Sequence, residues 1–306
     1  MKEDIDKAKS TALTLGVDIG GSHITTGLVD LEHKQLIEGS IKRKFIDSRA
    51  ACADILDGWS DIIRESYTEE LNPEITIGIA MPGPFDYNLG ISLIKDQDKF
   101  KSLYQVNIKE ELSKRLGIPS ENIRFINDAA GFLQGEVFAG AAKGKTGVMG
   151  LTLGTGLGSA FCINFKATDA ALWDSPFLSG IAEEFLSTQW FIKRYKELTT
   201  VELAGVKELV SLLPEDHAAT RVFMEFGHNL AQFLIPIINQ HEIDTVIIGG
   251  NIAQAFHEFA PELTATLKGN QVDATLKISE LKEHAALIGA ASCFDFNFQN
   301  TADKNH

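Results

Sequence analysis

A carboxylate and a short glycine turn near the start of this chain are the first residues whose spacing suggests chemistry. Asp18 ends an apolar run and is followed by Gly20, Gly21 and Ser22. Glycine amides carry no side chain that would keep an anion away from the backbone, so this turn could face a polyphosphate, with Asp18 near its Mg²⁺. The alternative is an acidic residue beside an ordinary hairpin turn, since glycine is common in such turns.

A second segment repeats the same residue types. Gly154, Thr155 and Gly156 follow the apolar run 148–153 and offer backbone amides and a hydroxyl group to phosphoryl oxygens. Neither turn ends in the Gly-Lys-Ser or Gly-Lys-Thr of a Walker A motif, and neither opens a helix as a Rossmann turn does. Two matching turns therefore predict a different kind of nucleotide site.

A third glycine segment joins a strand to a helix. Gly249, Gly250 and Asn251 follow the apolar run 245–248, and this flat backbone could lie against an adenine or a ribose. A structural turn is the alternative, because glycine-rich strand-to-helix turns are common.

Asn127 and Asp128 are the candidates for acid–base chemistry. They stand where a short apolar strand ends and a helix begins, so Asp128 could be only a helix N-cap. The functional alternative is that Asp128 accepts the proton of a substrate hydroxyl as that hydroxyl attacks a phosphoryl group, while Asn127 orients it. Gly83, in a Pro-Gly-Pro turn, and Glu183, in the first turn of a helix, could contact the same substrate, although both also suit purely structural roles.

The elements that must position these residues form two similar halves. Apolar runs at 12–18 and 24–29 flank the first glycine turn, and runs at 148–153 and 159–163 flank the second. A repeated strand–turn–strand unit indicates internal duplication and a cleft between the two halves. Further strands are expected at 75–80, 124–126 and 245–248, and helices at 50–67, 107–116, 129–139, 182–198, 218–240 and 252–259. This alternation predicts mixed α/β sheets.

The size of the chain is typical of two domains. With 306 residues, we expect an N-terminal α/β domain at 1–126 and a C-terminal α/β domain at 127–306, with a hinge near residue 127 and room for the final helix to pack back on the first domain. The net charge of −14 disfavours nucleic acid and anionic membranes as partners. No signal peptide or membrane-spanning run is present, and the three widely spaced cysteines predict neither a disulfide framework nor a zinc knuckle, so a cytoplasmic protein is expected.

Taken together, these segments resemble the ROK family of sugar kinases and repressors. The matching pieces are Val17-Asp18-Ile19-Gly20-Gly21-Ser22, Met81-Pro82-Gly83-Pro84, Asn127-Asp128-Ala129-Ala130, Leu153-Gly154-Thr155-Gly156-Leu157-Gly158 and Ile248-Gly249-Gly250-Asn251. The resemblance covers about residues 12 to 290. It implies a duplicated actin-like (ribonuclease H-like) fold in which ATP and a hexose meet in the interdomain cleft.

The resemblance also implies a role for each matching residue. Asp128 would be the catalytic base, Asn127 and Gly83 would contact the sugar, and Asp18 would organise Mg²⁺ through water. The turns at Gly20–Ser22 and Gly154–Gly156 would hold phosphates, while Gly249, Gly250 and Asn251 would approach the adenosine.

The chain also departs from the family pattern. Segment 165–179 contains no histidine or cysteine, so the usual Glu-x-Gly-His sugar motif and the cysteine-rich zinc loop are missing, and no zinc is expected. Glu183 resembles a remaining sugar-binding carboxylate. His23 stands where many members have lysine, a change that the sequence does not explain.

The leading hypothesis is an ATP-dependent kinase, for example a glucokinase, acting on a hexose or amino-sugar hydroxyl. The alternatives are a non-catalytic sugar or nucleotide sensor and a kinase of another small hydroxylated molecule, because a fold does not fix a substrate. A repressor is disfavoured, since only about ten residues precede the first strand and no helix-turn-helix domain fits there. A homodimer is the expected assembly, because two-fold dimers are the commonest oligomers.

Overall fold

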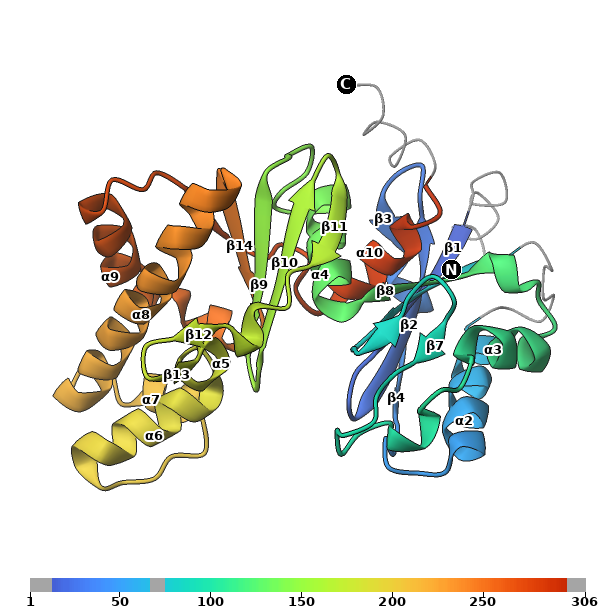
Figure 1. Cartoon of the computed structure of the whole chain (residues 1–306), viewed down its shortest axis with the longest axis horizontal. Helices are drawn as coiled ribbons and strands as arrows, with labels where there is room; N and C mark the ends of the chain where they lie inside the picture. Colours follow the sequence, from blue (N-terminus) through green and yellow to red (C-terminus); the bar gives the residue numbers. More distant parts are fainter. Residues whose placement is uncertain (1–12, 67–74, 296–306) are drawn as a thin grey trace.

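The computed structural model describes residues 13–66 and 75–295, which form alternating layers of helix and sheet (Figure 1). From the N-terminal side, these layers are a helical layer, a sheet, a pair of central helices, a second sheet and a second helical layer. Among the described residues, no helix is both long and apolar enough to cross a membrane.

The N-terminal sheet has six strands, in the order β3-β2-β1-β5-β8, with β4 also paired to β2. Its strands are β1 (Leu13–Ile19), β2 (His23–Asp30), β3 (Gln35–Leu36), β4 (Lys42–Phe45), β5 (Thr76–Met81) and β8 (Ile123–Asn127). β1 and β2 form an antiparallel hairpin, whereas β5 and β8 run parallel to β1. A small hairpin of β6 (Phe85–Asp86) and β7 (Ile91–Ser92) follows β5.

The C-terminal sheet has the corresponding order, β11-β10-β9-β14-β15. Its strands are β9 (Val148–Leu153), β10 (Leu157–Ile163), β11 (Lys166–Asp169), β14 (Thr245–Gly249) and β15 (Thr275–Ile278). β9 and β10 are antiparallel, and β14 and β15 are parallel to β9. Each sheet thus consists of a hairpin with parallel strands added to its first strand, which confirms the predicted duplication.

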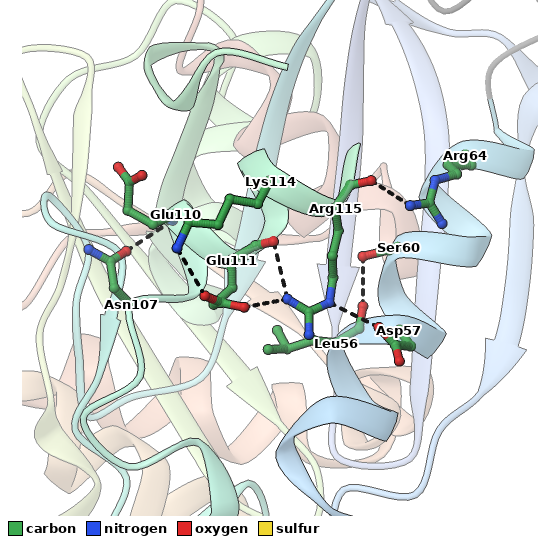
Figure 2. A network of polar contacts seen from close by, with 9 residues as sticks. All are labelled: Leu56, Asp57, Ser60, Arg64, Asn107, Glu110, Glu111, Lys114 and Arg115. Atoms are coloured by element: carbon green, nitrogen blue, oxygen red, sulfur yellow. Dashed lines mark hydrogen bonds and ion pairs between the residues drawn. The ribbon is translucent and has the colours of Figure 1, made fainter. Parts of the chain in front are cut away.

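Two outer helices, α2 (Cys52–Glu65) and α3 (Ile108–Leu116), cover the N-terminal sheet. A polar network joins them (Figure 2): Arg115 pairs with Glu111 within α3 and with Asp57 of α2, the latter at 2.9 Å. Asn107 caps α3 by accepting the Glu110 N–H at 3.1 Å. These contacts lie at or near the surface and contribute little stability each, so the buried apolar side chains beneath them hold the layer in place.

The outer layer of the C-terminal sheet is larger. It contains α6 (Thr188–Thr199), α7 (Val206–Ser211), α8 (His217–His241) and α9 (Phe256–Gly269). Along β14, Val246 and Ile248 face this layer, while Ile247 between them faces the central helices. Strand geometry explains this division, because successive side chains point to opposite faces.

The two central helices, α4 (Asp128–Ala139) and α10 (Ala285–Ser292), lie between the sheets (Figure 1). α4 packs on the C-terminal sheet and α10 on β1 and β5, and the two helices contact one another extensively. Glycine allows this close approach: a Cβ atom at Gly78 of β5 would lie 1.9 Å from the Ala290 carbonyl oxygen. The last described helix therefore packs against the N-terminal sheet, as expected for the final helix, while the predicted domain boundary at 126/127 stays a prediction.

Two predicted helices differ from the structure. The helix predicted at 182–198 is broken into α5 (Ala182–Phe185) and α6, because the Thr188 N–H and hydroxyl both bond the Gly154 carbonyl oxygen, at 2.8 and 2.9 Å. The helix predicted at 252–259 is a short 3₁₀ turn (Asn251–Ala255) followed by the longer α9. Part of the strand predicted at 12–18 and of the helix predicted at 50–67 lies outside the described residues.

Candidate functional site

Three neighbouring parallel strands bring the N-terminal candidates to one edge of the sheet. Asp18 of β1 lies in register with Ala80 of β5, and Met81 of β5 lies in register with Asn127 of β8. Because parallel strands end at the same edge, Asp18, the turn containing Gly83 and the start of α4 are neighbours. The corresponding edge of the C-terminal sheet carries the turn after β9 and the turn after β14.

A cleft of 760 Å³ lies between these edges and is lined by both halves of the chain. Of the predicted site residues, the lining includes Gly83, Asn127, Asp128, Gly154, Thr155, Gly156, Glu183, Gly250 and Asn251. Asp18, Gly20, Gly21, Ser22 and Gly249 are not part of that lining. The volume is in the usual range for small-molecule sites.

Asn127, rather than Asp128, is the N-cap of α4. Its side-chain oxygen accepts the Ala130 N–H at 3.0 Å, and its amide group donates to the Tyr87 hydroxyl at 3.2 Å. Asp128 is the first helical residue, and it lines the cleft. The predicted alternative in which Asp128 is the N-cap is therefore wrong, because Asn127 performs the capping, while the catalytic role of Asp128 stays a prediction.

Three carboxylates in and beside the cleft influence one another. Burial first, and the charge of Asp128 second, raise the pKa of Asp18 to about 7, while Arg43 acts in the opposite direction. Desolvation by the cleft walls raises the pKa of Asp128, and Asp169 at the end of β11 adds to this effect. Asp169, which sequence reasoning missed, also lines the cleft. Clustered acids with raised pKa values are typical of functional sites.

A carboxylate from α5 supports the turn between β9 and β10. Glu183 of α5 accepts the Leu157 N–H at 2.9 Å, and a Cβ atom at Gly156 would lie 2.5 Å from the same carboxylate oxygen. Thr155 is exposed at the tip of the turn and lines the cleft. One oxygen of Glu183 is therefore engaged in supporting the glycine turn, which sequence reasoning did not foresee.

The turn between β1 and β2 is accompanied by a cation from a distant loop. A Cβ atom at Gly21 would lie 2.4 Å from Lys99 Nζ, so the lysine side chain lies directly on this glycine. Lys99 is exposed, and within residues 13–66 and 75–295 it forms no ion pair. The Ser22 hydroxyl lies 3.0 Å from His23 Nδ1. Nothing in the local sequence of the turn indicates Lys99, because 76 residues lie between it and Ser22. The tertiary fold alone places it there.

The residues of the third glycine segment face different surroundings. Gly250 has a φ of +83°, and a Cβ atom there would lie 2.3 Å from the Leu153 carbonyl oxygen, so only glycine fits. Gly250 and Asn251 line the cleft, whereas Gly249 faces the ring of Phe132 at 2.5 Å from the corresponding Cβ position. Gly249 thus serves packing against α4.

The lining of the cleft also includes a polar and an aromatic side chain that the sequence did not indicate. Gln97 donates from its side chain to the Gly83 carbonyl oxygen at 3.1 Å, and both residues line the cleft. Trp173, in a 3₁₀ turn (Leu172–Asp174), lines it as well, with 46% of its surface exposed. Neither Gln97 nor Trp173 was predicted from the sequence.

Comparison with known proteins identifies related chains. The model of the family described as "ROK family" matches residues 14–170 and 179–295. A glucokinase of Thermotoga maritima is 31% identical over 144 residues, which are 47% of this chain and 42% of that protein, so the matched region spans less than half of that relative. The N-acetylgalactosamine kinase AgaK of a Shewanella species is 21% identical over 90% of this chain and 94% of its own length.

Solved structures share the fold. A ROK family glucokinase of Streptomyces griseus, in complex with glucose and AMPPNP, has a TM-score of 0.71 at 21% identity and covers 92% of this chain and 98% of that one. A ROK family transcriptional regulator, a homologue of the E. coli MLC protein, has a TM-score of 0.76 at 18% identity, covering 95% and 80%. These likenesses confirm the predicted duplicated, two-domain α/β fold.

Proposed function

The chain belongs to the ROK family, and from that premise we propose that it is an ATP-dependent kinase of a hexose or amino-sugar hydroxyl group. The observation that supports this most is that Asp128, at the start of α4, shares one cleft with the glycine turn after β9 and with Gly250 and Asn251. A proton acceptor, a phosphate-binding turn and a flat backbone for adenosine are the parts that phosphoryl transfer needs.

In the proposed reaction, Asp128 accepts the proton of the attacking hydroxyl group, whose oxygen bonds the γ-phosphorus while the bond to the β-phosphate oxygen breaks. ADP leaves with that electron pair. The Asn127 side chain is held by its hydrogen bonds to Ala130 and Tyr87, so it would contact the acceptor from one fixed position. Gly154, Thr155 and Gly156 would hold phosphates, and the turn at Gly20–Ser22 would approach them when the two halves close. Positioning and charge neutralisation account for most of the catalysis in such reactions.

The residues near Asp18 fit a hydrated Mg²⁺. Mg²⁺ usually retains several waters and binds one or two carboxylates together with substrate phosphates. Asp18 and Asp128 lie close enough to raise the pKa of Asp18, a repulsion that a dication would relieve. Among the described residues, no group of three or more histidine, cysteine or acidic side chains could hold a metal, so phosphates and water would complete the shell. When bound, the ion would neutralise charge on the transferring phosphoryl group.

The acceptor would lie near Gly83, Gln97 and Trp173. Peptide and amide groups can bond sugar hydroxyls, and an indole ring offers an apolar surface to the C–H face of a pyranose. Glucokinases and amino-sugar kinases among the relatives support this acceptor class. A non-catalytic sensor is the second candidate, because a transcriptional regulator shares the fold and one oxygen of Glu183 already bonds the Leu157 N–H.

The direct test compares wild type with Asp128→Asn in an ADP-release assay across hexoses and N-acetylhexosamines. Loss of the proton acceptor is expected to lower kcat by about 10²- to 10⁴-fold with ATP and sugar affinity largely retained. Asp174→Asn serves as the matched control, because Asp174 is near the cleft but not part of its lining. Equal, sugar-independent rates for all three proteins would overturn the kinase proposal, and sugar binding by calorimetry without turnover would favour the sensor.

A further inference from the structure

A second cavity, of 550 Å³, adjoins the cleft and shares two lining residues with it, Asn127 and Asp169. Both halves of the chain line it. Lys109 at the start of α3 and Arg124 of β8 come from the N-terminal half, and Lys166 of β11 comes from the C-terminal half. We name it the lysine cavity. Nothing in the proposed phosphoryl transfer uses these three side chains.

The charge of the lysine cavity is opposite to that of the whole chain. Three cations line it, and Asp169 is the single carboxylate among its lining residues. The chain carries a net charge of −14, so most of its surface repels anions. A cationic concavity on an acidic protein therefore concentrates anions at one place.

The walls of the lysine cavity are fixed by contacts. Arg124 donates to the Cys293 carbonyl oxygen and lies over the Phe294 ring, 4.6 Å from its centroid. Gln134 of α4 donates to the Phe165 carbonyl oxygen at 3.1 Å and accepts the Ala167 N–H at 2.8 Å. A preformed wall binds a ligand without a large ordering cost.

Two of the cations have no carboxylate partner among the residues that the structure describes. Within residues 13–66 and 75–295, neither Lys109 nor Lys166 takes part in an ion pair. Arg124 and Lys166 both lower the pKa of the Cys293 thiol, against the burial that raises it to about 11, so their charges act on the same part of the cavity. Like charges gathered from two domains repel one another unless an anion lies between them.

We propose that the lysine cavity binds a phosphorylated small molecule of about hexose phosphate size, with Lys109, Arg124 and Lys166 around the phosphate. Charge-assisted bonds to phosphate are the strongest that these side chains can form. The volume, which is within the 300–1,000 Å³ or so typical of ligand pockets, is much larger than one phosphate ion needs. The remaining space is lined by Tyr87, Asn88 and Thr168, whose polar groups suit a hydroxylated body.

Binding is measured by calorimetry on the full chain, using glucose 6-phosphate, inorganic phosphate and glucose as separate probes. Wild type is compared with Lys109→Gln/Lys166→Gln and with the control Lys207→Gln, which removes a positive charge from an exposed position on α7. The double variant is expected to bind glucose 6-phosphate at least about tenfold more weakly, whereas the control binds it like wild type. Saturating glucose and AMPPNP are expected to leave wild-type binding in place.

Three results would overturn the proposal: equal affinity in all three proteins, equal affinity for inorganic phosphate and glucose 6-phosphate, or loss of binding when glucose and AMPPNP are added. The last would place the ligand in the main cleft. Melting temperatures without ligand check that the variants fold. They are expected to lie within a few degrees of wild type, because neither lysine pairs with a carboxylate in the described part of the chain. None of these measurements depends on turnover, so their failure is distinguishable from failure of the kinase proposal.

Discussion

Individual residues in the cleft carry roles that depend on their immediate neighbours. Asn127 caps α4, and this leaves the adjacent Asp128 carboxylate available to a substrate. Glu183 has two roles. It lines the cleft, and its carboxylate accepts the Leu157 N–H next to the glycine turn that is predicted to hold phosphates. Replacing Glu183 would therefore disturb the turn as well as any sugar contact.

Lys99 is expected to contact the phosphates of ATP. Its ammonium group lies on Gly21 and has no ion-pair partner among the described residues, so Lys99→Gln should lower kcat/KM for ATP by about tenfold or more. Lys95→Gln, in the same loop, is the matched control and should retain wild-type kinetics. Steady-state assays with ATP varied at saturating sugar measure both, and equal losses in the two variants would show a general charge effect instead.

Asp18 is expected to make the metal-free protein less stable as pH rises. Its folded pKa of about 7 lies above the unfolded value of about 3.9, so the folded state binds more protons between these values. The stabilising contribution is present at low pH and is lost as pH rises through about 7. Urea unfolding in EDTA from pH 5 to pH 8 should show this decline in wild type and a smaller one in Asp18→Asn.

Asp273→Asn, an exposed carboxylate between α9 and β15, provides the control for that experiment and should follow wild type. Parallel curves for wild type and Asp18→Asn at every pH would contradict the assignment. Added Mg²⁺ and ATP should favour the charged form of Asp18 and so reduce the decline.

Among the secondary-structure elements, the α4–α10 pair determines how closely the two halves approach. A Cβ atom at Gly135 would lie 2.1 Å from the Ala285 carbonyl oxygen, and one at Gly289 would lie 1.9 Å from the Gly131 carbonyl oxygen. Both helices are therefore in backbone contact. The buried Glu136 of α4 also links α4 to the segment before α10. Its carboxylate accepts the Leu281 N–H at 2.9 Å and the Ala141 N–H at 2.7 Å.

Gly135→Ala is expected to destabilise the protein by about 1–3 kcal/mol, because the added methyl group forces the two helices apart. Gly58→Ala in α2 is the matched control. Apart from its chain neighbours and the backbone of its own helix, no described residue lies within 4 Å of its Cβ position, so alanine should stabilise that helix by up to about 1 kcal/mol. Denaturant unfolding measures both changes. Stabilisation by both substitutions would mean that α4 and α10 can separate without cost.

At the scale of the whole molecule, the two glycine turns lie in different places relative to the cleft. The turn after β9 lines the cleft, whereas the turn between β1 and β2 does not. If both hold phosphates, the two halves must close about the α4–α10 pair. Domain closure of this kind excludes water and completes a site only when both substrates are bound.

Small-angle scattering is expected to show a smaller radius of gyration with AMPPNP and an accepted sugar together than with either ligand alone. The reason is that the closed cleft is filled only when both ligands are bound, so the pair favours the closed state more than either ligand alone. In Gly135→Ala the added methyl group separates α4 from α10, so the decrease in the radius of gyration should be smaller than in wild type. An unchanged radius with both ligands bound would contradict closure.

The sequence by itself determined the duplicated strand–turn–strand units, the strand ends carrying Asp18, Asn127 and Asp128, and the glycine turns, because periodicity and turn chemistry are local properties. Only the tertiary structure decided that α10 packs beneath β1 and β5, that Lys99 lies on Gly21, that Glu183 supports the second turn, and that three cations meet in the lysine cavity. Each of these contacts joins residues that are far apart in the chain. Such contacts depend on how close-packed layers fit together, and no local sequence pattern predicts that fit.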